Sequence, residues 1–164
     1  MNQWQNKVAV ITGAGSGIGA GLARYCSQLD MHVVAADISE QSLGELAASL
    51  SSTEHQLSTV KLDVRIAEDV EALAQTVFEQ HGQVNLLFNN AGVLVDGKSW
   101  ERKLNDWRWI IDVNVMGVIH GITSFVPRML KQGHEGRIVN TSSIGGLLGG
   151  GQYLAPYQGT KHMI

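Results

Sequence analysis

Two side chains near the end of the sequence have the types and the spacing needed for proton transfer. Tyr157 and Lys161 lie four positions apart, so on a helix they share one face. A free phenol is a weak base at neutral pH, and an ammonium group beside it stabilises the phenolate form. The pair could act together as acid and base, although a helical Tyr and Lys at this spacing are more often an ordinary surface pair. Tyr153 has no Lys four positions later and is interpreted as a pocket-wall residue.

Polar side chains inside or after apolar segments add to this pair. Ser142 and Ser143 follow a short apolar run, and Asn114 interrupts a long one. A serine hydroxyl can stabilise charge that develops on a substrate oxygen, but a Ser pair after a strand is more often a turn or a helix cap. A buried Asn needs hydrogen-bond partners. Each signal alone is weak, so the surrounding elements decide its meaning.

A glycine-rich turn, residues 12–19 (Thr-Gly-Ala-Gly-Ser-Gly-Ile-Gly), directly follows an apolar run and opens an amphipathic segment. Such a turn presents backbone N–H groups and a helix N-terminus to a diphosphate. We expect Gly13 to permit the tight turn, Gly17 to let the diphosphate approach, and Gly19 to let the helix pack on the strand. The flanking strand and helix predict nucleotide binding more strongly than the glycines alone.

Asp37 lies 24 positions after Gly13, at the end of the next apolar run. This is close to the spacing of about 20 at which a carboxylate reaches the adenosine ribose. Such a carboxylate would repel a 2′-phosphate, and neither Ser16 nor Ile38 supplies a cation for one, so NAD is favoured over NADP. Asp37 could also simply cap the following helix, and the two roles do not exclude each other.

The apolar pattern positions these residues on an alternation of strands and helices. The strands are expected at 7–12, 31–37, 56–63, 84–89 and 136–143, and the helices at 17–29, 39–51, 66–82 and 103–131. Strand and helix in alternation predict an α/β fold with a doubly wound parallel sheet, Rossmann-like and NAD(P)-binding. The length of 164 residues predicts a single domain over 1–164.

In its order of motifs the sequence resembles the short-chain dehydrogenase/reductase family over its whole length. The turn motif, the run Asn-Asn-Ala-Gly at 89–92, Asn114, the Ser pair and the Tyr-x-x-x-Lys motif occur in that family's order. The resemblance implies a hydride transfer between nicotinamide and a secondary alcohol or ketone.

The resemblance also implies roles for individual residues. The catalytic set would be Asn114, Ser143, Tyr157 and Lys161, with Tyr157 as acid/base, Lys161 on the nicotinamide ribose and Asn114 holding a relay water. Ser143 is preferred to Ser142 because the family usually uses the second serine of such a pair. The cofactor would contact Gly13, Ser16, Gly17, Ile18, Gly19, Asp37, Asp63, Val64, Asn90, Tyr157 and Lys161. A dinucleotide-binding module without turnover, or an inactive fragment, is the alternative.

Composition excludes several other classes. A net charge of −3 with 12 scattered Lys and Arg residues gives no basic surface for nucleic acid. No apolar run approaches the roughly 20 residues of a membrane span, the polar first residues lack the long apolar segment of a secretory signal, and a cytoplasmic protein is expected. Cys26 is alone and is interpreted as a small buried residue, and the six His are too dispersed for a metal site.

Two further expectations concern substrate and assembly. Leu147, Leu148 and Leu154, in and after the glycine-rich loop 144–151, favour an apolar alcohol or ketone as substrate. The helix at 103–131 is apolar around nearly its whole circumference, so we expect a second cover for it, either another subunit in a homo-oligomer or further chain. The chain also resembles a C-terminally truncated member of the family, lacking the sixth and seventh strands, and its fifth strand would then be an exposed apolar edge.

Overall fold

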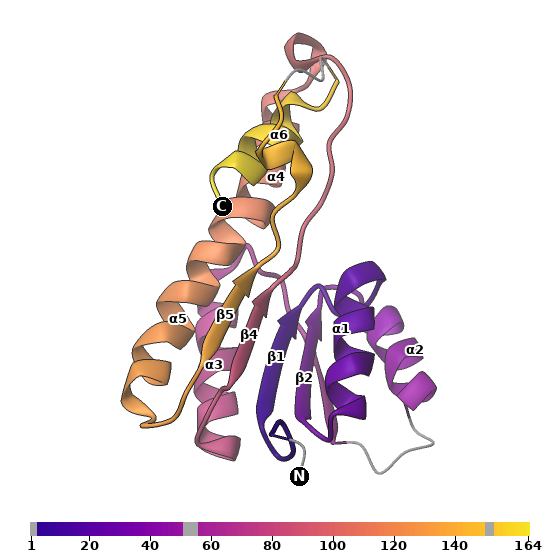
Figure 1. Cartoon of the computed structure of the whole chain (residues 1–164). Coiled ribbons are helices and arrows are strands. Elements are labelled where there is room, and N and C mark those ends of the chain that lie inside the picture. Colours follow the sequence, from indigo (N-terminus) through magenta and orange to yellow (C-terminus); the bar gives the residue numbers. More distant parts are fainter. Residues whose placement is uncertain (1–2, 51–55, 150–152) are drawn as a thin grey trace.

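The computed structural model describes residues 3–50, 56–149 and 153–164. The last residue of the expected second helix and the end of the expected glycine-rich loop (150–151) lie outside these ranges. Within them the chain alternates strands and helices, as predicted (Figure 1). The order is β1 (Val8–Thr12), α1 (Gly17–Gln28), β2 (His32–Asp37), α2 (Glu40–Leu50), β3 (Leu57–Lys61), α3 (Ala67–His81), β4 (Leu86–Asn89), η1 (Ser99–Glu101), α4 (Leu104–Ile111), η2 (Asp112–Met116), α5 (Gly117–Lys131), β5 (Arg137–Asn140), η3 (Ile144–Gly146) and α6 (Ala155–His162).

The strands form one parallel sheet in the order β3-β2-β1-β4-β5. The chain winds outward in both directions from β1, so the strand order reverses between β1 and β4. In open α/β sheets, ligands bind in the crevice at the carboxyl ends of the strands at such a reversal. The predicted doubly wound fold is therefore confirmed, and it brings the ends of β1 and β4 together.

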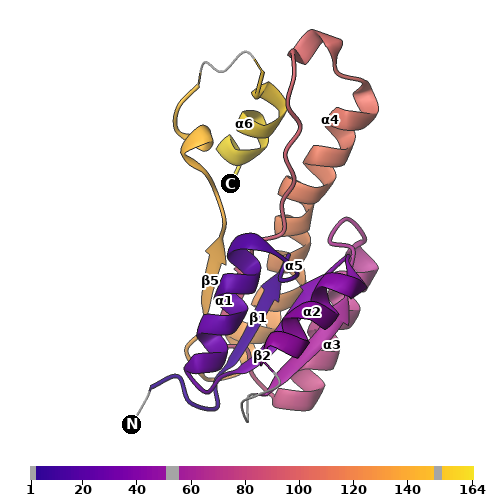
Figure 2. The same cartoon turned by 90° about the vertical axis from the view of Figure 1, so that its right-hand side faces the viewer.

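Both faces of the central strands are buried, which explains their continuously apolar sequences. Val8 and Val10 pack in one core layer with side chains of α3 and α5, while Ala9 and Ile11 pack in the other with α1 and α2. The same division is visible in Figures 1 and 2, where α1 and α2 lie on one side of the sheet and α3 and α5 on the other. Cys26 lies in the second layer at 2% exposure, as expected for a small core residue.

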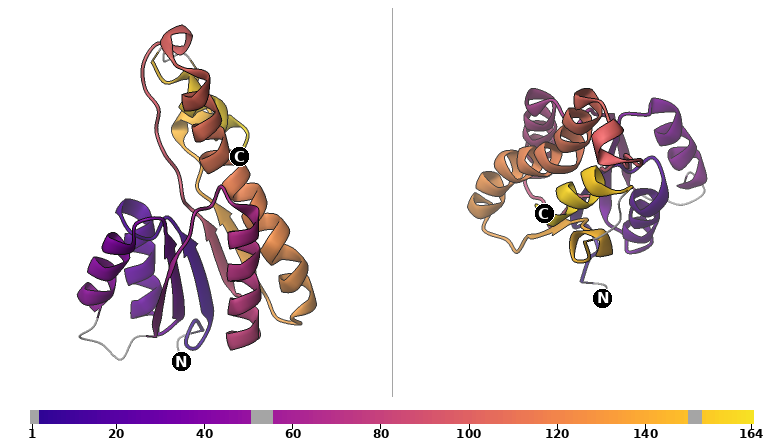
Figure 3. Two further views of the ribbon diagram at one scale, coloured as in Figure 1. Left: turned by 180° about the vertical axis from the view of Figure 1, so that it is seen from behind. Right: turned by 90° about the horizontal axis from the view of Figure 1, so that it is seen from above.

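The predicted long helix extends from Leu104 to Lys131. Its α-helical parts, α4 and α5, are joined without a break by a π-helical turn, η2, at Asp112–Met116. It runs past the carboxyl ends of the strands, and α6 packs beside its first part (Figure 3). One face is buried through Val113, Phe125 and Met129. Ile119 and Ile122 on another face are 41% and 36% exposed. No described residue of this chain covers that face, although the sequence led us to expect a cover for it.

By length and composition this 28-residue helix could cross a membrane, which differs from the expectation that no segment is long enough. The expectation considered only uninterrupted apolar runs. Half of the helix's most apolar window is buried within the protein, as in an ordinary core helix. Within the described residues it is the single helix of this kind.

Strand β5 forms one edge of the sheet, and all four of its residues are exposed. Ile138 and Val139 are 39% and 43% accessible. Within the described residues, the free side of β5 is thus the exposed apolar edge that the sequence predicted.

Candidate active site

The glycine-rich turn leaves β1 and enters α1 with two residues in the left-handed region, Gly13 at φ +66° and Gly17 at φ +50°. A Cβ atom on Gly13 would lie 2.7 Å from the Cα of Ala91. A Cβ atom on Gly19 would overlap the carbonyl oxygen of Gly13, so the close neighbour of Gly19 is the turn itself rather than the strand. Gly17 has open space on its outer side. The turn is therefore tight on its inner side and open where a ligand would approach.

Asp37, at the end of β2, is tied to this turn. Its carboxylate accepts hydrogen bonds from the backbone N–H of Gly15 and of Ser39, both at 2.9 Å. The hydroxyl of Ser39 in turn accepts from the backbone N–H of Ser42, at 3.2 Å, so Ser39 caps α2. Asp37 is thus a link between turn and helix that still lines the cleft described below. Gly15, which the sequence reasoning passed over, leaves room for this link, because a Cβ there would lie 2.9 Å from the Asp37 carboxylate.

Asp63 and Val64 follow β3 at the same edge of the sheet. The guanidinium of Arg65 donates to both carboxylate oxygens of Asp63, with its Nε at 2.9 and 3.0 Å and its Nη2 at 2.6 Å. These hydrogen bonds hold the pKa of the Asp63 carboxyl below its usual value. Arg65 was not predicted as a site residue, and only its position directly after Asp63 and Val64 could have indicated it.

The exits of β1 and β4 are joined by Thr12 and Asn90. The Thr12 hydroxyl accepts from the backbone N–H of Asn90 at 3.0 Å and of Ala91 at 3.1 Å, and it donates to the carbonyl of Phe88 at 3.3 Å. The Asn90 side chain donates to the Thr12 carbonyl at 3.1 Å. Together these bonds fix the backbone where the strand order reverses.

Tyr157 and Lys161 lie on α6, and both side chains line the cleft described below. Lys161 is only 5% exposed, and its ammonium donates to the carbonyl of Thr141 at 2.6 Å. It lies 6.0 Å from the centre of the Tyr157 ring, so the expected i, i+4 proximity is present. Burial lowers the pKa of the Lys161 ammonium. Tyr153, interpreted from the sequence as a pocket-wall residue, is 49% exposed and is not among the residues that line the cleft described below.

The two serines occupy different environments. Ser142 donates its hydroxyl proton to the carbonyl of Lys161 at 3.0 Å, which ties the strand exit to α6. Ser143 accepts from the N–H of Gly145 at 3.1 Å, which leaves its own proton free for another partner. Gly145 lies between Ser143 and Tyr157, because a Cβ on it would be 3.5 Å from the Ser143 Oγ and 3.6 Å from the Tyr157 Cε1.

Asn114 lies in the π-helical turn and is fully buried. Its amide accepts from the backbone N–H of Val93 at 2.8 Å, and it donates to the Val93 carbonyl at 2.9 Å and to the Thr160 hydroxyl at 3.0 Å. The buried Asn therefore has the partners that its burial requires. All its donors are used by protein groups, so its side chain has no free N–H for a relay water.

One cleft of about 740 Å³ brings most of the predicted residues together at the carboxyl ends of the strands. A cleft of this size is typical of small-molecule and cofactor sites. Its lining includes Gly13, Ser16, Gly17, Ile18, Asp37, Asp63, Val64, Asn90, Ser142, Ser143, Tyr157 and Lys161. Gly19 and Asn114 lie behind this lining. Arg65, Leu94, Trp109 and Thr141 also line the cleft. The described residues contain no cluster of His, Cys, Asp and Glu that could hold a metal ion.

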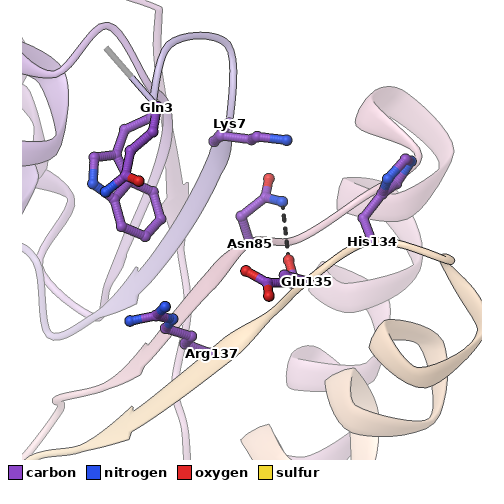
Figure 4. Close-up of a pocket in the computed structure, with 7 residues that line it drawn as sticks. Gln3, Lys7, Asn85, His134, Glu135 and Arg137 are labelled. Carbon is purple, nitrogen blue, oxygen red and sulfur yellow. Dashed lines mark hydrogen bonds between the residues drawn. The ribbon is translucent and has the colours of Figure 1, made fainter.

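A smaller cleft of about 250 Å³ lies at the opposite end of the sheet (Figure 4). Lys7, Glu135 and Arg137 give it mixed charge. Its buried amide, Asn85, accepts from the N–H of Val8 at 2.9 Å and donates to the carbonyl of Glu135 at 3.2 Å. None of the predicted site residues lies there, and the hydrogen bonds of Asn85 are those of a structural residue.

Comparison with known proteins places this geometry in a family. The family model described as short chain dehydrogenase matches residues 7–164. Cyclohexanol dehydrogenase from Acinetobacter sp. is 36% identical over 99% of this chain and 64% of its own length, and meso-2,3-butanediol dehydrogenase from Serratia marcescens is 39% identical over 94% and 59%. A short-chain dehydrogenase/reductase from Burkholderia phymatum, crystallised with NAD, superposes with a TM-score of 0.95 at 44% identity, over 99% of this chain and 58% of that one.

The chain thus spans about three fifths of the length of these relatives. Its five-stranded sheet, its turn and its motif residues lie within the matched part. The family match over nearly the whole chain, with a solved neighbour of the same architecture, shows that this protein belongs to the short-chain dehydrogenase/reductase family.

Proposed function

We propose that this chain carries the cofactor-binding part and the proton-transfer residues of a NAD-dependent oxidoreductase that acts on a secondary alcohol or ketone. The observation that carries the proposal is the single cleft that has the glycine turn and Asp37 in one part and Ser143, Tyr157 and Lys161 in another. A purely nucleotide-binding module needs only the first part.

The residues present fit a nicotinamide dinucleotide. A diphosphate would lie on the open side of the turn, near the backbone N–H groups of Gly13, Ser16, Gly17 and Ile18, which line the cleft, and no side chain obstructs Gly17. Asp37 would accept from the adenosine ribose, Asp63 and Val64 would contact the adenine, and Asn90 and Lys161 would lie along the nicotinamide ribose. When bound, the nicotinamide supplies the hydride acceptor or donor for the reaction.

Residues of this chain accept and donate the proton at the substrate oxygen. Tyr157 takes the alcohol proton in oxidation and returns it in reduction. The buried ammonium of Lys161, close to the phenol ring, favours the phenolate electrostatically. The free proton of Ser143 donates to the substrate oxygen and stabilises the charge that develops there. The commitment of the Ser142 proton to Lys161 supports Ser143 as the catalytic serine.

For Asn114 we propose a structural role of the side chain, whereas the resemblance implied that this residue holds a relay water. Its side chain joins Val93 to Thr160 and thereby holds the wall of the cleft. A relay water at Asn114 would therefore be held by an acceptor, either the side-chain oxygen or the backbone carbonyl, and not by the side-chain N–H groups.

NAD rather than NADP is proposed because Asp37 is a carboxylate in the ribose position. Arg65 adds a cation to that end of the cleft, but its guanidinium is already paired with Asp63. A 2′-phosphate would have to compete with that carboxylate for Arg65 and would meet Asp37 as well.

An apolar substrate is proposed from the lining beyond the proton-transfer residues. Leu94 and Trp109 also line the cleft, and Leu147 and Leu148 are 78% and 62% exposed on the loop after Ser143. Two of the relatives are named for cyclohexanol and butanediol, which are small alcohols without charge. A charged sugar phosphate would find few partners on this surface.

The protein is further proposed to be cytoplasmic and to form homo-oligomers through the exposed face of α4 and α5. Ile111, Ile119 and Ile122 on this face are each more than one third exposed. Sedimentation of the wild type and an Ile119→Lys variant tests the assembly, because the charge should dissociate an oligomer that uses this face. Unchanged sedimentation of the variant would contradict it.

The function is tested by measuring nicotinamide reduction with the protein as its gene encodes it. We expect turnover of apolar secondary alcohols such as cyclohexanol with NAD, slower turnover with NADP, and slower turnover of polyhydroxy or phosphorylated alcohols. Binding of NAD without turnover of any alcohol or ketone would support the alternative of a non-catalytic binding module. Absence of NAD binding would overturn the proposal altogether.

A further inference from the structure

A buried chain of hydrogen bonds connects the wall of the cleft to the helix of Tyr157 and Lys161. Asn114 uses its amide on both backbone groups of Val93 and on the hydroxyl of Thr160. Thr160 is 2% exposed, and it passes its single hydroxyl proton to the carbonyl of Tyr157 at 2.8 Å. Each N–H and O–H of the two side chains therefore has a partner.

Thr160 lies on α6, at the contact between this helix and another helical element. Its partner is the π-helical turn η2, a rare conformation that often occurs at functional sites. Val93, the residue at the other end of this series of hydrogen bonds, follows β4 and lines the cleft. Thr160 thus links the helix that carries Tyr157 to the wall that faces the ligand.

We propose that Thr160 is a positioning residue: its hydroxyl holds α6 in register with Asn114 and Val93, so that Tyr157 and Lys161 keep their places in the cleft. The inference rests on the proposed function and deepens it, because it assigns a part in the reaction to a side chain that does not line the cleft.

The hydroxyl, rather than the size of the side chain, is what this role requires. A valine has the same shape as threonine, but it would leave one buried N–H of Asn114 without an acceptor. An unpaired buried donor is unfavourable, so the helix would move or admit water to satisfy it. Either change displaces Tyr157, and a displacement of about 1 Å can lower a rate about a hundredfold.

Two substitutions at Thr160 and one elsewhere separate this role from general stability. Thr160→Val removes the hydroxyl, and Thr160→Ser keeps it. Thr76→Val is the matched control, because Thr76 makes the same kind of bond to the carbonyl of Ala72 within α3 but is exposed and distant from the cleft. All three are made in the protein as its gene encodes it, and rates are expressed per NAD-binding site so that unfolded protein does not count.

We expect Thr160→Val to lower kcat about tenfold to a hundredfold, while KM for NAD changes by a smaller factor because the glycine turn and Asp37 still hold the other end of the cofactor. Thr160→Ser should restore most of kcat, and Thr76→Val should leave it at the wild-type value. Backbone hydrogen exchange should become faster in α6 of Thr160→Val and stay unchanged in Thr76→Val. If Thr160→Val does not fold, Thr160→Ala removes the same hydroxyl and serves in its place.

A wild-type kcat in Thr160→Val, or an equal loss in Thr160→Ser, would overturn the assignment. If the wild type shows no turnover at all, the proposed function fails, and hydrogen exchange then tests the link by itself. Unchanged protection of α6 in Thr160→Val would refute the link whatever the activity.

Discussion

Gly19 offers a quantitative test of the turn geometry, because the same helix contains a matched control. A Cβ on Gly19 would overlap the carbonyl oxygen of Gly13 and lie 2.7 Å from the Asn90 Nδ2. A Cβ on Gly21, two residues later in α1, would meet nothing within 4 Å. Both substitutions to Ala gain helix propensity, worth about 0.5–1 kcal/mol. Only Gly19→Ala adds the clash.

Forcing extra atoms into a packed site costs about 1–3 kcal/mol. We therefore expect Gly21→Ala to raise the free energy of unfolding by about 0.5–1 kcal/mol. The free energy of unfolding of Gly19→Ala should be lower than that of Gly21→Ala by about 1–3 kcal/mol. Urea unfolding followed by circular dichroism measures both. Because the turn must shift in Gly19→Ala, NAD affinity should also fall about tenfold in that variant alone. Equal stability and equal NAD affinity of the two variants would refute the account of the turn.

Three further outcomes follow from buried or charged groups. Burial raises the pKa of the Cys26 thiol to about 11, so a disulfide reagent at pH 8 should modify Cys26 only after denaturant is added; rapid modification of the native protein would contradict its burial. Burial, and then the charge of His32, lower the pKa of His81 below its ordinary 6.5, so the unfolded chain binds more protons and the free energy of unfolding should decrease as pH falls through the folded-state pKa. His81→Gln should flatten this pH dependence, and an equally steep dependence would assign it to other groups. Asp37→Ala should weaken NAD binding and reduce the preference for NAD over NADP, and an unchanged ratio of the two affinities would show that Asp37 does not read the ribose.

The fold could be predicted because its signals are local. The continuously apolar run at Val8–Thr12 indicates a strand buried on both faces, and the glycine turn after it indicates the switch to a helix. Parallel pairing then follows from the alternation of strands and helices. The same reasoning places Asp37, Asp63 and Asn90 at one edge, because the carboxyl ends of parallel strands meet there.

Features that depend on contacts between distant segments could not be predicted. The π-helical turn around Asn114 has no pattern of its own in the sequence, and it is evident only from the backbone. The pairing of Asn114 with Thr160 joins residues 46 positions apart. The different roles of Ser142 and Ser143 depend on where α6 packs, since one hydroxyl meets the Lys161 carbonyl and the other does not. The place of Arg65 at the cleft could not be predicted either, because it depends on the contact between its guanidinium and the carboxylate of Asp63.

The central claim is that Tyr157 carries the proton in a hydride-transfer reaction. Tyr157→Phe removes only the phenol oxygen and keeps the ring beside Lys161. The decisive measurement is kcat and the NAD dissociation constant of this variant, side by side with the wild type. The account predicts that kcat falls about a hundredfold to ten-thousandfold while NAD binding is retained. Wild-type turnover in Tyr157→Phe would contradict it.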